Sequence, residues 1–417
     1  MATTSVWNSI NSLPPDAIFA LAAEAKKAPQ PKADLIIGAY RDADGRPYPL
    51  KVVRKAERRL LEMNLDKEYL PMAGYGPLIE ESMKLIYGDS VPRENLVGAQ
   101  GLSGTGSLCL GAFFISRVLS TKTPVYISNP TWPNHYAVMS TAGLTDLRQY
   151  RYYNDTRRCL DFEGLMEDLG AAPAGSVVIL HACAHNPTGM DPTHEQWGEI
   201  AKLFKTRRLI PFFDSAYQGY ATGSLDNDAY AVRLFARQGM EMLVAQSYSK
   251  NMGLYSERVG VCSVVTANPS KATMIRMQLE HIARGLYSSP PSHGARVAHL
   301  VLSDPELRSE WEAELCGMAQ RVQEMRQDVY NGLKQRGTPG NWEHVVQQVG
   351  MFSYLGLTKA QCAKLVQKRV FVLASSRANM ASLTKQTTGL LVGAIDDVVR
   401  DVTLASSGVS TAAKAKI

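Results

Sequence analysis

Short apolar runs that end abruptly in polar or glycine-rich turns recur along the chain. The clearest of them occupy positions 124–132, 176–189, 209–219 and 241–250. Stretches with helical periodicity lie between them. Apolar strands that alternate with amphipathic helices are typical of an α/β fold with a mostly parallel sheet. We therefore expect a large α/β domain whose sheet is flanked by helices.

Capping residues indicate where several of the helices begin. Thr193 and Gln196 form a capping-box pattern at the start of the stretch 194–207. An Asn-Pro pair opens the stretch 268–284, and an Asp-Pro pair opens the long stretch 304–336. A further helix is expected from about Thr105 to Leu119, directly after the glycine-rich run Ser-Gly-Thr-Gly.

The last hundred residues follow a different pattern. Positions 345–357 and 370–381 read as strands with a helix between them, and the composition shifts near residue 318. This pattern predicts a second, smaller α+β domain at the C-terminal end of the chain.

Composition and charge exclude several classes of function. The 417 residues are 45% hydrophobic and 20% charged, with a net charge of +6 spread over the chain, so we expect a globular protein that does not bind nucleic acid. The longest uncharged run, 95–116, contains five glycines and is a poor membrane span. The six cysteines form no CxxC pair and no zinc-type spacing, which predicts free thiols, a reducing compartment and no metal site.

Targeting signals favour a cytoplasmic location. The first ten residues lack the charged and apolar regions of a secretory signal. The final three residues, Ala-Lys-Ile, loosely resemble a peroxisomal address, which leaves a peroxisome-like organelle as the alternative.

Polar side chains stand at the ends of three predicted strands. They are Asn186, Asp214 with Tyr217, and Lys250. Ligands of open α/β sheets bind beyond the carboxyl ends of the strands. The run 103–106 adds a helix N-terminus suited to an anion. It matches neither a Walker loop nor a dinucleotide fingerprint.

One cofactor, pyridoxal 5'-phosphate, would use all of these features. It needs a lysine for a Schiff base, an acid for its pyridine nitrogen and a phosphate cradle. Lys250 and Asp214 supply the first two, and Tyr217 and Asn186 can donate to the ring oxygen. The phosphate would lie on the anion seat at 103–106.

Three more residues fit this cofactor. Ser247 and Arg258 flank the lysine and can bind phosphate, while Trp132 offers a face on which the ring can stack. Each feature also has an ordinary explanation, such as a surface lysine, a helix N-cap or a core tryptophan, but their ordered coincidence favours the cofactor. We expect His181 and His185 to be packing or supporting groups, because no carboxylate shares their local spacing.

These motifs resemble the aspartate aminotransferase family of class I aminotransferases, which are pyridoxal-phosphate enzymes of fold type I. The resemblance runs from about residue 34 to 390, and its most specific parts are "HNPTG" and "SYSKNMGLYSERVG". The other matching stretches are "GAYRDADGRPYPLKVVRKAE", "EYLPMAGYG", "SGTGSLCLGA", "PTWPNH", "FFDSAYQGYATGSLDNDAYAVR" and "GARVAHLVL".

The resemblance implies a role for each matching residue. Lys250 is the Schiff-base lysine and proton shuttle, Asp214 pairs with the pyridinium, and Trp132 stacks on the ring. Tyr217 and Asn186 contact the ring oxygen. The phosphate binders are Ser103, Gly104, Thr105, Ser247 and Arg258, with Tyr69 reaching in from a neighbouring subunit.

The resemblance also implies a substrate site shared between the two subunits of a homodimer. Arg377 clamps the α-carboxylate, with Gly38, Trp132 and Asn186 beside it, and Arg284 reads the side-chain carboxylate across the dimer. Arginine suits both tasks because its guanidinium grips a carboxylate in bidentate fashion.

Four departures from the family pattern lie near the substrate mouth. Ser376 and Ser382 stand where glycine is usual, Ser289 where asparagine is common, and Ile36 where glycine is common. They leave the cofactor chemistry intact, and they indicate relaxed specificity that extends to aromatic amino acids.

The expected activity is the transfer of the amino group of L-aspartate to 2-oxoglutarate, giving oxaloacetate and L-glutamate. The expected organisation is an arm at 1–14, a large domain at 47–317, and a small domain formed by 15–46 and 318–417. The alternatives are an enzyme with aromatic or broad donor preference, a non-catalytic cofactor-binding regulator, and a nucleotide-binding oxidoreductase. Arg284 argues against a purely aromatic site, and the absent dinucleotide fingerprint argues against the oxidoreductase.

Overall fold

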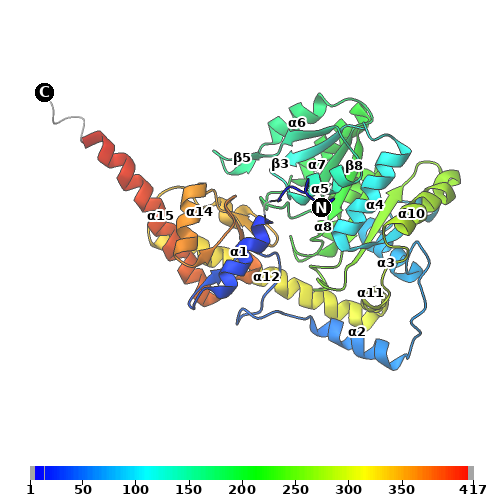
Figure 1. Ribbon diagram of the computed structural model, residues 1–417, viewed down its shortest axis with the longest axis horizontal. Coiled ribbons are helices and arrows are strands. Elements are labelled where there is room, and N and C mark those ends of the chain that lie inside the picture. The colour runs from blue at the N-terminus through cyan, green and yellow to red at the C-terminus, as the bar shows by residue number, and fades with distance from the viewer. Residues whose placement is uncertain (1–4, 14, 412–417) are drawn as a thin grey trace.

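The computed structural model describes residues 5–13 and 15–411, and its centre is a seven-stranded sheet (Figure 1). The strand order is β2-β10-β9-β8-β7-β3-β4. Strands β9, β8, β7, β3 and β4 are parallel, while β10 runs antiparallel to both β9 and β2. The predicted mostly parallel α/β sheet is therefore confirmed. The strands are β2 Leu96–Leu102, β3 Val125–Asn129, β4 Leu147–Arg151, β7 Val177–His181, β8 Ile210–Ser215, β9 Met242–Ser247 and β10 Val259–Val265.

Helices cover both faces of this sheet, as a buried parallel sheet requires. Neighbouring residues of a strand point to opposite faces, so Phe212 packs in one core cluster and Phe213 in the other. The Phe212 face is covered by α4 Ser103–Val118, α5 Asn134–Thr141 and α10 Ala272–Leu286. The Phe213 side holds α3 Gly76–Tyr87, α6 Phe162–Gly170, α7 His194–Arg207, α9 Tyr230–Arg237 and α11 His293–Ser303.

One long helix, α12 (Pro305–Gln335), connects this layered body to the rest of the chain (Figure 1). It packs against α11 and α2 (Lys51–Glu62) at one end and against α15 (Lys385–Thr411) at the other. Two small sheets accompany its second half, β1 with β12 and β11 with β13. These elements are α1 Ala17–Lys27, β1 Ala33–Asp34, α13 His344–Gln347, β11 Phe352–Tyr354, α14 Lys359–Gln367, β12 Val370–Phe371 and β13 Arg377–Asn379.

Short elements complete the described chain. A hairpin is formed by β5 (Tyr153–Asn154) and β6 (Cys159–Leu160), and α8 (Leu225–Asp228) precedes α9. Single 3-10 turns lie at Arg93–Asn95, Pro269–Lys271 and Met380–Ser382. No helix in the described ranges is both long and apolar enough to cross a membrane. All six cysteines are free thiols.

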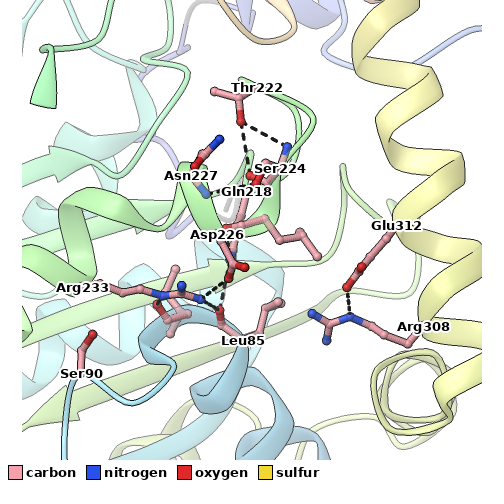
Figure 2. A network of polar contacts seen from close by, with 12 residues as sticks. Leu85, Ser90, Gln218, Thr222, Ser224, Asp226, Asn227, Arg233, Arg308 and Glu312 are labelled. Atoms are coloured by element: carbon pink, nitrogen blue, oxygen red, sulfur yellow. Dashed lines mark hydrogen bonds and ion pairs between the residues drawn. The ribbon is translucent and has the colours of Figure 1, made fainter.

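Side-chain bonds hold the turn that follows β8. Figure 2 shows Arg233 of α9 bonded to Asp226 at 2.8 Å and to the carbonyl oxygen of Leu85 in α3 at 3.1 Å. The buried carboxylate of Asp228 accepts hydrogen bonds from the backbone nitrogens of Gly219 and Ala221. Asp228 therefore anchors this turn two residues after Tyr217.

Most predicted elements appear where the sequence placed them. The capping box of Thr193 and Gln196 is present at α7. Three expectations need correction. The stretch 345–357 is not one strand, because α13 occupies its first residues and only Phe352–Tyr354 pairs with β13. The stretch 370–381 is not one strand either, because it is divided into β12 and β13, which belong to different small sheets. The helix expected from about Thr105 begins at Ser103.

The domain division stays a prediction. The composition shift near residue 318 lies inside α12, so it marks no break in secondary structure. Two other expectations fall partly or wholly outside the described residues. They are the arm at 1–14, of which 5–13 is described, and the terminal Ala-Lys-Ile signal.

Candidate active site

The carboxyl ends of the parallel strands bring together polar residues that are far apart in the sequence. His181 at the end of β7 is in register with Asp214 of β8, and Asp214 is in register with Ala245 of β9. Ser247 ends β9, three residues before Lys250. The strand-end cluster expected from the sequence therefore forms at one edge of the sheet.

Lys250 is the partly buried cation of this cluster. Its Nζ donates to the carbonyl oxygen of Gly38 at 2.8 Å and lies 4.8 Å from the centre of the Tyr255 ring. Burial, with the positive charges of Arg258 and Arg377, lowers the pKa of Lys250 to about 8 against the opposing effect of Asp214. With this pKa, about a tenth of the Lys250 population is free amine at pH 7.

Asp214 is buried and keeps one carboxylate oxygen free. Its Oδ2 lies 3.0 Å from Nε2 of His135, while Oδ1 has no hydrogen-bond partner among the described residues. His135 is fixed from its other side by Thr131, whose hydroxyl lies 2.8 Å from Nδ1. A buried carboxylate oxygen without a partner is costly, and a protonated ring nitrogen is the kind of donor that would satisfy it. This fits the expected pyridinium partner.

Two further histidines extend this group, because His181 lies next to Asp214 and His185 lies next to His181. Burial holds the pKa of both His181 and His185 well below the usual value, so both rings are neutral. The His181 ring lies 4.2 Å from that of His185 and 5.1 Å from that of His135. Ligand atoms of His135, His181 and Asp214 lie within 4.8 Å of one another. No carboxylate shares the local sequence spacing of these histidines, but Asp214 arrives from the neighbouring strand, so their expected supporting role stays a prediction.

The N-terminus of α4 forms a cradle of hydroxyl groups. The Ser103 hydroxyl lies 2.9 Å from that of Ser247 and 2.6 Å from that of Ser249. Arg258 lies on the rim and donates to Ser249 at 3.4 Å. A Cβ on Gly104 would approach Ser247 to 3.2 Å, so the glycine leaves space beside the Ser247 hydroxyl. Hydroxyls, first-turn amides, including that of Thr105, and a guanidinium suit a phosphate group.

Arg377 is buried, and its positive charge acts on Lys250. Its guanidinium donates to the carbonyl oxygen of Ile36 at 2.8 Å and to Oδ1 of Asn186 at 3.3 Å. The Phe352 ring lies beneath it, with 4.0 Å between the guanidinium carbon and the ring centre. Nε of Arg377 has no hydrogen-bond partner in the part of the chain that the structure describes. Burial lowers the pKa of Arg377 to about 10, so it stays charged at neutral pH.

The remaining predicted residues divide into two groups. Tyr217 is buried with its ring 6.2 Å from that of Phe352, and Trp132 is partly buried with its ring against His135. Tyr69 is 91% exposed, and Arg284 is exposed and donates only to Ser288 within the described chain. The structure of one chain therefore does not bring Tyr69 or Arg284 to Lys250.

The serines that depart from the family pattern have structural roles. Ser376 has φ +69°, the backbone region that favours glycine. Its hydroxyl accepts from the Leu357 nitrogen at 2.8 Å. The hydroxyl of Ser382 accepts from Asn379 at 2.7 Å and donates to the Ala39 carbonyl at 3.3 Å. Both therefore replace glycine while adding a hydrogen bond.

Sequence reasoning missed four residues of this site: His135, Ser249, Tyr255 and Phe352. His135 lies in the run "PTWPNH", and Ser249 and Tyr255 lie in "SYSKNMGLYSERVG", so all three stand in matching motifs that assign them no role. Phe352 sits in an apolar stretch that carries no polar signal. Only its contact with Arg377 distinguishes it from an ordinary core residue.

Comparisons with known proteins agree with this geometry. The family described as aminotransferase class I and II matches residues 30–395. Cytoplasmic aspartate aminotransferase of Oryza sativa subsp. japonica is 47% identical over 405 residues, which cover 96% of this chain and 99% of the relative. The solved structure of aspartate aminotransferase from Trypanosoma cruzi is 72% identical, with a TM-score of 0.89, and covers 95% of this chain and 100% of that one.

A third relative carries the cofactor in its structure. It is an aromatic-amino-acid aminotransferase from Burkholderia pseudomallei, covalently bound to pyridoxal phosphate, with 37% identity and a TM-score of 0.92. The match covers 95% of this chain and 100% of that one. From its sequence, fold and strand-end cluster alike, this chain belongs to the class I and II aminotransferase family.

Proposed function

We propose that the chain is an aspartate aminotransferase, which moves the amino group of L-aspartate to 2-oxoglutarate with pyridoxal 5'-phosphate as cofactor. One observation carries the proposal. A lysine of lowered pKa (Lys250), a buried carboxylate with a free oxygen (Asp214) and a buried arginine (Arg377) converge at one edge of the sheet.

The cofactor would be held by residues of three strand ends and one helix. Asp214 would bind the pyridine nitrogen through its free Oδ1, and the hydroxyl cradle of Ser103, Ser247 and Ser249 would take the phosphate with Arg258. When bound, the cofactor supplies an electron sink for the negative charge left after a substrate loses its α-proton. His135 holds the Asp214 carboxylate in place by its bond to Oδ2.

Lys250 is the proposed base and acid of the reaction. With a pKa of about 8, its free amine can accept the α-proton of the substrate, and the ammonium can return it elsewhere. The Gly38 carbonyl oxygen and the Tyr255 ring stabilise the charged form between these transfers. Burial raises the pKa of Tyr217, which keeps its hydroxyl protonated as a hydrogen-bond donor.

Arg377 is the proposed clamp for the substrate α-carboxylate. It is charged and buried, its Nε has no partner within 5–13 and 15–411, and Phe352 supports its flat face. Gly38 would border the bound carboxylate, and this position requires glycine because a Cβ there would meet Phe352 Cζ at 2.6 Å. The Trp132 ring and the Asn186 amide would complete this wall of the substrate site.

The active form is proposed to be a homodimer whose two sites are shared. The exposure of Tyr69 and Arg284 in one chain supports this assignment, because both expected ligand-binding residues are available to a second copy. Arg284 would then read the side-chain carboxylate of aspartate, and Tyr69 would reach the phosphate. The relative from rice named as cytoplasmic supports the same location for this chain.

A second candidate activity is transamination of aromatic amino acids by the same site. The similarity to an aromatic-amino-acid aminotransferase favours it, as do Ser289, Ser376 and Ser382 near the substrate mouth. Because Arg284 is exposed and tied only to Ser288 among the described residues, it could swing aside for an uncharged ring. This activity would add to aspartate turnover and not replace it.

An absorbance titration of the purified protein with candidate amino acids tests both activities. The cofactor has different spectra in its aldehyde and amine forms, so each amino donor can be scored without its oxo-acid partner. L-Aspartate should convert the spectrum and 2-oxoglutarate should restore it. A chain whose spectrum responds to aromatic amino acids but not to aspartate would refute the main assignment.

A further inference from the structure

A buried arginine outside the cofactor pocket has no acidic partner in the described chain. Arg326 lies on α12 among Met325, Val322 and Val329, and only 2% of its surface is exposed. Its acceptors within residues 5–13 and 15–411 are four backbone carbonyl oxygens, and its Nε has none. Burying a cation without a countercharge is expensive, so the arrangement calls for a structural reason.

The four carbonyls belong to one short segment, 345–352. Arg326 donates to Val345 at 3.3 Å, to Val349 at 3.4 Å and to Gly350 at 2.9 Å, and it also bonds to the carbonyl of Phe352. One planar guanidinium thus reaches across the whole bend from α13 to β11. A lysine could not hold all four oxygens, because its ammonium is a single point of charge.

The same segment is packed against the turn that carries Asn186. The backbone nitrogen of Val349 donates to the Gly189 carbonyl at 2.7 Å. Gly350 has φ +78°, and a Cβ there would meet the Cβ of Ala184 at 2.3 Å. These contacts fix the segment on the side of Asn186, and the bonds from Arg326 fix it on the side of α12.

Phe352 connects this segment to the substrate site. Its ring lies under the Arg377 guanidinium, 6.2 Å from the Tyr217 ring, and against Gly38. Its backbone carbonyl is one of the oxygens held by Arg326. A shift of this backbone would move the platform on which Arg377 rests.

We propose that Arg326 is a positioning residue for the α-carboxylate site, acting through Phe352 on Arg377. The inference rests on the proposed function, since it takes Arg377 as the carboxylate clamp. Burial lowers the pKa of Arg326 to about 9, which still leaves the guanidinium charged at neutral pH, so its grip on the carbonyls persists there.

The proposal can be tested by steady-state kinetics of the Arg326→Lys holoenzyme. This variant keeps the positive charge but loses the planar guanidinium that reaches several carbonyl oxygens. The KM should rise about tenfold for aspartate and by the same factor for an aromatic donor, because both share only the α-carboxylate, and kcat should change less than threefold. An unchanged KM at a temperature well below the melting point would overturn the proposal and leave Arg326 a stability residue.

Two variants serve as matched controls. Arg308→Met removes another α12 arginine, whose ion pair with Glu312 appears in Figure 2. Thr338→Val removes the buried 2.8 Å bond to Asp396 and lowers stability away from the site. Both should leave KM unchanged. A KM increase in Thr338→Val that matched its loss of stability would count against a specific role for Arg326.

A double-mutant cycle with Phe352→Leu identifies the route. If Arg326 acts through Phe352, the double variant should show nearly the KM of Phe352→Leu alone. If the KM increase of the double variant equalled the product of the two single increases, Arg326 would not act through Phe352.

Failure of the proposed function is distinguishable from failure of this inference. In the first case the wild-type protein would show no aspartate turnover, whereas in the second case the wild type would be normal.

Discussion

The ammonium nitrogen of Lys250 lies 2.8 Å from the carbonyl oxygen of Gly38, although 212 positions separate the two residues. Gly38 also touches Phe352, which supports Arg377. The group expected to move the proton and the group expected to hold the substrate are therefore connected through one glycine. A side chain at position 38 would disturb both.

The first prediction concerns the covalent site. Borohydride reduction of the purified, yellow protein should fix the cofactor to Lys250, because Lys250 is the amine of lowered pKa beside the cradle. Peptide mapping of the reduced protein measures this. A label on any other lysine, or the absence of a chromophore, would show that the site is assigned wrongly.

The pH dependence of cofactor capture follows from the same pKa. Below pH 8 Lys250 is mostly ammonium, so its free-amine fraction falls about tenfold for each pH unit. The rate at which the cofactor-free chain binds cofactor should rise with pH and level off above about pH 8. Stopped-flow absorbance measures it, and a rate still climbing steeply at pH 10 would mean an unshifted lysine.

Asp214→Ala should reduce turnover roughly a hundredfold or more, because it removes the charge that stabilises the protonated ring. The variant should still be labelled at Lys250 by borohydride. Asp226→Asn, an exposed carboxylate paired with Arg233, is the matched control and should keep normal turnover. Near-normal turnover in Asp214→Ala would make Asp214 a purely structural residue.

Arg284→Ala should damage turnover of aspartate and glutamate far more than that of an aromatic donor, because only the acidic side chains lose a partner. Arg276→Ala, an exposed arginine on the same helix, should affect no donor. Values of kcat/KM for three donors measure this. Equal losses for all donors in Arg284→Ala would assign the residue to folding or to the dimer interface.

Shared sites can be tested by mixing two inactive chains. Lys250→Ala and Arg284→Asp should each be nearly inactive as homodimers. In a mixed dimer with shared sites, one site carries both defects, while the other has an intact Lys250 and an intact Arg284. Co-refolding should therefore restore aspartate turnover, and verified mixed dimers without activity would rule out sharing.

Much of the fold was predictable because strands and helices carry local signals. The parallel strands β3, β7, β8 and β9 lie inside apolar runs with clear ends. The antiparallel edge was harder to see, because β2 contains two glycines and leads directly into α4. The start of 345–357 reads as a strand because α13 is only four residues long and has two adjacent valines at its centre.

Site residues that lie in short sequence motifs could be predicted, whereas those whose roles depend on tertiary contacts could not. Lys250 and Asp214 lie in motifs that indicate their roles. His135 acquires its role only because Asp214 arrives from another strand, and Arg326 looks like an ordinary surface arginine within a long helix. A linear pattern cannot show that its guanidinium meets four carbonyls and no carboxylate.

Helix α12 fixes the distance and the rotation between two of its side chains, Trp311 and Arg326, that hold different parts of the site. Near one end, Trp311 donates to the carbonyl of Asn251, the residue after Lys250, at 2.7 Å, and Arg326 grips the Phe352 segment further along. Fifteen residues separate them, about 22 Å along the axis and roughly sixty degrees around it. One inserted residue would turn the second anchor by about a hundred degrees. Insertions should therefore be tolerated in the loops but not in α12 between Trp311 and Arg326.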